Sequence, residues 1–153
     1  MSIDIIIIGA GPAGMSAAIT AAESGAKVLL LDDQPTPGGQ IYRAIEAAGD
    51  KHAAILGPEY MAGKPLAQNM HSTNIEYVAD ASVWQVTDER EVGYSSNEQA
   101  RLVTAPAIIL ATGAMERPFP IKGWTLPGVM MAGAAQTMLK TSGLAAEGAI
   151  FAG

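Results

Sequence analysis

The sequence contains no cysteine, and this absence removes several kinds of chemistry at once. Disulfide bonds, thiolate nucleophiles, cysteine-ligated metals and redox-active dithiols are all excluded within this chain. The two histidines, His52 and His71, do not have the spacing of a metal-ligand pair. We therefore predict no metal site.

Basic residues are also scarce. Nine lysines and arginines stand against fifteen acidic residues, which gives a net charge of −6. Nucleic acids and polybasic membrane anchors both depend on clustered positive charge, so neither kind of partner is expected. No apolar run is long enough to span a bilayer, and the apolar N-terminus lacks the basic leader of a signal peptide. These features predict a cytoplasmic location.

The first part of the chain predicts a strand, a helix and a second strand. Residues 3–8 form an almost continuous isoleucine run, which is typical of a strand buried on both faces of a parallel sheet. Residues 13–24 are alanine-rich and of helix length, Gly25 stands at the position of a helix stop, and residues 27–31 predict another buried strand. The order is that of a βαβ unit.

Further along the chain, the patterns predict a helix over 58–71, an alternating strand over 75–89 and a hairpin over 90–105. Residues 107–111 predict a third buried strand, and residues 129–142 a helix. The fold class is therefore α/β: a Rossmann-like domain with a parallel sheet, plus an inserted antiparallel β-hairpin layer.

A glycine-rich loop, G-A-G-P-A-G, lies between the first strand and the first helix, where a dinucleotide-binding fingerprint belongs. Gly9 would permit the tight turn, Gly11 the approach of a pyrophosphate, and Gly14 close packing of the helix on the sheet. The N–H groups and partial positive charge of the helix N-terminus would hold the phosphates. The loop residues predicted to bind the cofactor are Gly9, Ala10, Gly11, Pro12, Ala13 and Gly14.

Asp32 follows the second predicted strand, where a carboxylate commonly accepts hydrogen bonds from an adenosine ribose. Only one of the adjacent carboxylates Asp32 and Asp33 needs to face the ribose. An acidic residue here disfavours a ribose 2′-phosphate, and hence NADP. On this reasoning alone the cofactor is FAD or NAD.

Two further stretches resemble a known family. The segment P-G-G-Q-I at 37–41 and the segment I-I-L-A-T-G at 108–113 resemble the two-dinucleotide flavoproteins, which include thioredoxin reductase and glutathione reductase. The resemblance implies FAD, with the G-G segment along the cofactor, the A-T-G turn closing over it, and the strand near 81–83 reading the adenine. The additional cofactor-binding residues that it implies are Asp33, Gln34, Gly38, Gly39, Gln40, Val83, Ala111, Thr112 and Gly113.

The resemblance can be narrowed with the stretches DDQPTPGGQIYR, ILGPEYMAGKPL and LATGAMERPFPIKGWTLPGVMMAGAAQTMLK. They are similar to the large flavin subunits of opine oxidases, hydrogen cyanide synthase and dye-linked proline or hydroxyproline dehydrogenases, and more distantly to the alpha chain of sarcosine oxidase. This implies a heteromeric enzyme that oxidises the C–N bond of a small amino-acid-like substrate, with hydride transfer to flavin. The redox cysteine that disulfide reductases carry after the G-G pair is absent, since residues 39–43 read G-Q-I-Y-R.

The end of the chain repeats the start in outline, because residues 148–153 read G-A-I-F-A-G. We expect residues 1–147 to be the N-terminal part of the FAD-binding domain. Residues 148–153 would be the first strand of a second nucleotide-binding domain, which could take NAD. The chain is thus expected to be an N-terminal segment of a longer protein, to bind FAD weakly or not at all on its own, and to be inactive alone.

Two alternatives remain at this point: the NAD-binding domain of an ordinary dehydrogenase, and a non-catalytic binding or assembly subunit. No catalytic residue is assigned. Glu116 and Arg117 could form a local surface ion pair or meet flavin or a partner subunit. Helix core and the filling of gaps in the core are favoured over pocket lining for four methionines: Met115, Met130, Met131 and Met138.

Overall fold

The computed structural model describes residues 2–72 and 75–151. The chain divides into two compact units, residues 1–113 and residues 114–153. Residues 148–151 do not form the expected strand. Residues 152–153 lie outside the described residues, so the second domain stays a prediction.

The first unit is built on a parallel sheet with strand order β3-β2-β1-β7. Ile6 of the central strand β1 pairs with Leu29 on one side and with Ile108 on the other. The predicted βαβ unit and the α/β fold class are confirmed. The strands of this sheet are β1 (Ile5–Ile8), β2 (Val28–Leu31), β3 (Ile75–Val78) and β7 (Ala107–Leu110).

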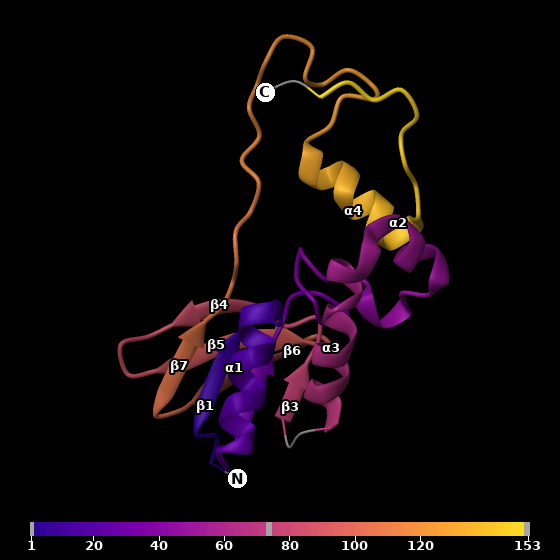
Figure 1. Cartoon of the computed structure of the whole chain (residues 1–153). Helices are drawn as coiled ribbons and strands as arrows, with labels where there is room; N and C mark the ends of the chain where they lie inside the picture. Colours follow the sequence, from indigo (N-terminus) through magenta and orange to yellow (C-terminus); the bar gives the residue numbers. More distant parts are fainter. Residues whose placement is uncertain (1, 73–74, 152–153) are drawn as a thin grey trace. The chain divides into compact units, whose positions relative to one another are not determined.

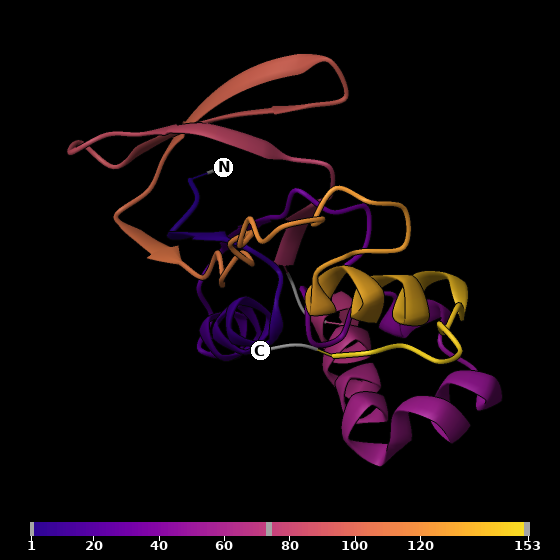
Figure 2. The same cartoon turned by 90° about the horizontal axis from the view of Figure 1, so that it is seen from above.

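Alternate side chains of the central strands enter two separate cores, which explains the continuous apolar runs. Ile7 and Leu30 pack against the helical layer, whereas Ile6 and Leu29 pack against an antiparallel sheet. The helical layer and the antiparallel sheet thus cover opposite faces of the parallel sheet (Figures 1 and 2). The other elements of this unit are α1 (Pro12–Glu23), η1 (Ile45–Ala47), α2 (Asp50–Met61), α3 (Gly63–Ser72), β4 (Ser82–Val86), β5 (Glu91–Ser96) and β6 (Gln99–Thr104).

The helix-side core makes a direct stability prediction. Leu30 is fully buried, so Leu30→Ala should remove buried surface, leave a cavity and lower the free energy of unfolding by about 3 kcal/mol. Ile55 on α2 is 60% exposed, and Ile55→Ala should change it by less than about 0.5 kcal/mol. Urea unfolding of both variants checks this. Equal losses would mean that the two positions are not buried as the structure shows.

Three sequence expectations need correction. The strand predicted over 75–89 is two strands, β3 and β4, which lie in different sheets, because the chain turns at Asp80 with φ +50°. The helix predicted over 58–71 is divided between α2 and α3. Strand β7 forms as predicted but is an edge strand, and its Leu110 is 66% exposed. An apolar run therefore did not imply burial here, because no described strand pairs with the outer edge of β7.

The hairpin prediction is confirmed, since β5 and β6 pair around a turn at Asn97 and Glu98. The second unit contains α4 (Ala132–Ser142), which ends at Gly143 with φ +65°. Glycine adopts this left-handed conformation more readily than other residues, and the helix ends at residue 142 as predicted. Among the described residues, no helix is both long and apolar enough to cross a membrane.

Candidate functional site: a glycine-lined cavity at the end of the parallel sheet

The three glycine-containing motifs come together at the carboxyl ends of β1 and β2. The Gly38 N–H donates to the Ala10 carbonyl at 2.8 Å, and the Ala111 N–H donates to the Ile8 carbonyl at 2.8 Å. A Cβ placed on Gly39 would lie only 2.8 Å from the Cα of Gly11. The G-G segment and the A-T-G turn therefore both pack directly against the loop at 9–14.

The glycines of the loop serve different purposes. Gly9 has φ +104°, and a side chain there would collide with the Ala111 carbonyl. A side chain at Gly14 would overlap the Gly9 carbonyl oxygen. At Gly11, in contrast, the nearest atom to an added Cβ is 3.9 Å away. The protein's own packing thus requires Gly9 and Gly14, while the space at Gly11 leaves the backbone open to a ligand.

Helix α1 begins within this glycine motif, at Pro12. Gly11 is its N-cap and Pro12 occupies its first turn, with no side-chain cap and no acidic residue there. The N–H groups at a helix N-terminus have no partner within the helix and carry partial positive charge. This end of α1 is therefore suited to an anionic group such as a phosphate.

Asp32 follows β2 and is 7% exposed. Burial raises the pKa of its carboxyl to about 6, although hydrogen bonds from the backbone N–H groups of Ala10 and Asp33, and the charge of Arg43, oppose the rise. The Asp33 charge adds to it. The Oδ2 atom of Asp32 is buried and has no hydrogen-bond partner among the described residues. Such an atom is an unused acceptor for a ligand hydroxyl.

A cavity of about 200 Å³ lies beside this carboxylate. Five of its lining residues, Gly9, Asp32, Asp33, Val83 and Thr112, were predicted from the sequence. Ile8 and Leu31 were not predicted, because an aliphatic side chain carries no chemical signal of its own. The lining residues are Ile8, Gly9, Leu31, Asp32, Asp33, Ala81, Val83 and Thr112.

The other predicted residues do not line the cavity. Gly38 and Gly39 pack behind the glycine loop, and Gly113 is exposed. Gln34 and Gln40 both contact the side chain of Arg43. Arg43 is therefore a residue of this region that the sequence analysis did not select, because its spacing from the glycines matches no general pattern.

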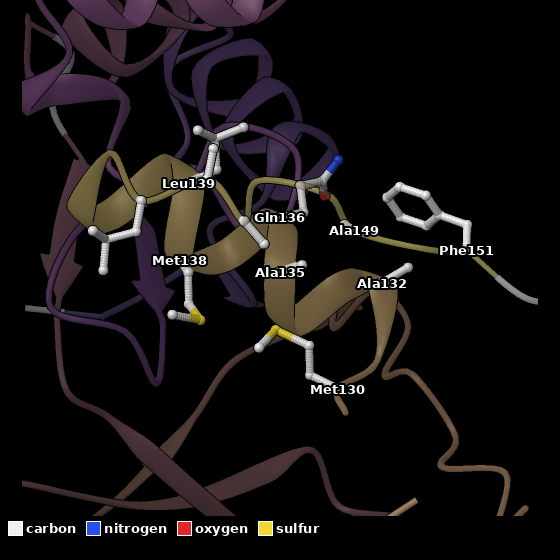
Figure 3. Close-up of a pocket in the computed structure, with 11 residues that line it drawn as sticks. Met130, Ala132, Ala135, Gln136, Met138, Leu139, Ala149 and Phe151 are labelled. Atoms are coloured by element: carbon white, nitrogen blue, oxygen red, sulfur yellow. The ribbon is translucent and has the colours of Figure 1, made fainter. Parts of the chain in front are cut away.

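A larger cavity of about 530 Å³ lies in the second unit, between α4 and residues 144–151 (Figure 3). Met130 and Met138 line it, so helix core is the wrong interpretation for them, and Met115 is 92% exposed. None of its lining side chains is titratable. Glu116 forms no ion pair with Arg117 among the described contacts. Its carboxylate accepts the Gly133 N–H at 3.0 Å at the start of α4.

Of these two cavities, only the smaller one is lined by titratable side chains, those of Asp32 and Asp33. The described residues contain no group of three or more His, Cys, Asp or Glu side chains that could hold a metal ion. A parallel sheet with a glycine loop, an open helix N-terminus and a buried carboxylate defines a dinucleotide-binding Rossmann-like domain. The chain belongs to the pyridine nucleotide-disulphide oxidoreductase family, whose pattern matches residues 3–146.

Individual relatives agree with this assignment. An opine oxidase subunit of Agrobacterium tumefaciens (strain Ach5) is 47% identical over 96% of this chain. The hydrogen cyanide synthase subunit HcnB of Pseudomonas protegens is 34% identical over 92%. The chain spans 31% of the length of each of these relatives. The crystal structure of L-proline dehydrogenase from P. horikoshii has the same fold, with a TM-score of 0.75 at 21% identity over 95% of this chain and 29% of that one.

Proposed function

We propose that this chain supplies the adenosine- and pyrophosphate-binding part of an FAD site in a flavin-dependent oxidoreductase. The observation that carries the proposal is the buried, unpartnered Oδ2 of Asp32 beside a cavity that the glycine loop also lines. Asp32 would accept the ribose hydroxyls, and Gly11 with the N-terminus of α1 would accommodate the pyrophosphate.

The residues present fit such a cofactor. The acceptor of Asp32 has no protein donor among the described residues, the backbone at Gly11 is open, and the first turn of α1 holds no acidic side chain that would repel phosphate. FAD, when bound, would accept a hydride from the substrate. Within this chain the residues around the cavity would bind and orient the adenosine half.

The names of the relatives support a finer proposal for the whole protein. The matched chains of opine oxidase, hydrogen cyanide synthase and sarcosine oxidase are each named as one subunit of the enzyme. We therefore infer oxidation of the C–N bond of an amino-acid-like substrate, in an assembly with other subunits. The chain alone is expected to turn over nothing. NAD binding by a second domain and a cytoplasmic location stay predictions.

The first experiment is the visible absorption spectrum of the purified protein, before and after incubation with FAD and gel filtration. A flavin band that is retained after gel filtration, and that a hundredfold excess of NAD does not displace, would support the proposal. A colourless protein would favour the alternative of a binding or assembly subunit. Displacement by NAD would favour the domain of an ordinary dehydrogenase.

A further inference from the structure

The backbone of Arg43 is held in place from two sides. Its carbonyl oxygen accepts a hydrogen bond from the Tyr60 hydroxyl at 2.7 Å. The preceding residue, Tyr42, donates its N–H to the Gly38 carbonyl at 3.0 Å. Arg43 is thus attached both to α2 and to the G-G segment, which itself packs on the glycine loop.

The guanidinium of Arg43 contacts two of the residues that were predicted to bind the cofactor. Its Nη1 donates to the Gln34 Oε1 at 2.8 Å, and its Nη2 donates to the Gln40 Oε1 at 3.3 Å. A guanidinium has no acceptor, so both glutamines must turn their carbonyl oxygens toward it and their NH₂ groups away. The Gln34 NH₂ accordingly donates to the Asp33 Oδ1 at 3.1 Å.

Arg43 also acts on Asp32 through its charge. It is the only positively charged side chain among the described causes that lower the pKa of the Asp32 carboxyl, whereas burial and the Asp33 charge raise it. Tyr77 is the other titratable group near Asp32. Burial raises the pKa of the Tyr77 hydroxyl, so this group stays neutral while Asp32 titrates. The charge state of Asp32 is therefore set mainly by burial and by the hydrogen bond from the Ala10 N–H, while the charges of Asp33 and Arg43 act in opposite directions with smaller effects.

We propose that Arg43 is a positioning residue of the nucleotide site, which orients Gln34 and Gln40 and keeps the Asp32 carboxylate available as an acceptor for nucleotide hydroxyls. This proposal rests on the proposed FAD site. Arg43 itself does not line the cavity, so its effect passes through the residues that it holds.

Two variants of Arg43 separate its charge from its hydrogen bonds. Arg43→Gln removes the charge, and Arg43→Lys keeps the charge but loses the planar pair of donors. Arg101→Gln is the matched control, because Arg101 is exposed on β6 and contacts only Gln99 among the hydrogen bonds described for its side chain. Circular dichroism establishes that each variant is folded.

The first readout is the pKa of the Asp32 carboxyl, measured by ¹³C NMR during a pH titration. This measurement needs no nucleotide. Arg43→Gln should raise the pKa of Asp32, while Arg43→Lys and Arg101→Gln should leave it near its original value. An unchanged pKa in Arg43→Gln would overturn the proposal, whether or not the protein binds FAD. If Arg43→Gln does not fold, the proposal is tested with Arg43→Lys instead. The FAD affinity of Arg43→Lys then shows whether Gln34 and Gln40 are still correctly oriented.

The second readout is FAD affinity, measured by quenching of flavin fluorescence at pH 6 and pH 8. Arg43→Gln should bind FAD roughly tenfold more weakly than the original protein at pH 6, and Arg43→Lys should lie between the two. Affinities within twofold of the original in both variants would overturn the proposal. If the unaltered protein binds no FAD, the proposed function fails, and the NMR titration still decides the electrostatic role of Arg43.

Discussion

Gly14→Ala is expected to lower the free energy of unfolding by about 3 kcal/mol or more, the largest loss that we predict for a single methyl group in this chain. The Cβ would overlap the carbonyl oxygen of Gly9 and would lie 3.3 Å from the Cβ of Ala111. Gly14 is buried at the point where α1 packs on the sheet. The overlap involves backbone, which cannot move without separating the helix from the sheet.

A matched substitution isolates this effect. Gly49 precedes α2 with φ −117°, and no atom lies within 4 Å of a Cβ added there. Gly49→Ala should therefore change the free energy of unfolding by less than about 0.5 kcal/mol. Urea or thermal unfolding of both variants makes the comparison. Equal stability of the two alanine variants would show that α1 does not approach the sheet as closely as described.

Gly14 also shows how far the sequence could predict this fold. A buried strand, a glycine loop and an alanine-rich helix follow each other without interruption in the sequence. The local pattern of residues was therefore sufficient to predict this part of the fold. The position of Asp32 followed from the same unit, because it ends the second strand. Burial of its carboxylate, with one oxygen left unpartnered among the described residues, depends on packing and was not predictable from the pattern.

To predict the remaining elements correctly, one would have to know which strands are neighbours in the sheets. The alternation over 75–89 continues across Asp80, yet its two halves belong to different sheets. The apolar run of β7 is the same as that of a central strand, yet Leu110 is 66% exposed. Arg43 was missed for a related reason. Its contacts with Gln34 and Gln40 exist only after the loop folds back, so no spacing in the sequence indicates them.

The second large effect is expected at Asp32, where stability and binding should change in opposite directions. The Asp32 carboxyl has a pKa of about 6 in the folded protein against an ordinary value of 3.8. Between these two values the folded state holds a proton that the unfolded state has released. Stability therefore falls as the pH rises from about 4 to about 6 and stays at the lower level above that. Asp32→Asn, which is neutral at every pH, should escape this loss.

We accordingly expect Asp32→Asn to raise the free energy of unfolding by about 1–3 kcal/mol at pH 8, with little change at pH 4. The control Asp88→Asn removes an exposed charge and should have little effect at either pH. In the same proteins, FAD affinity at pH 8 should fall at least about tenfold in Asp32→Asn alone, because a charged acceptor for the ribose is lost. A gain in stability that is equal at both pH values would contradict burial of the charge as its cause. Unchanged FAD affinity would instead contradict the ribose contact, so the two measurements test the electrostatics of Asp32 and its proposed ligand separately.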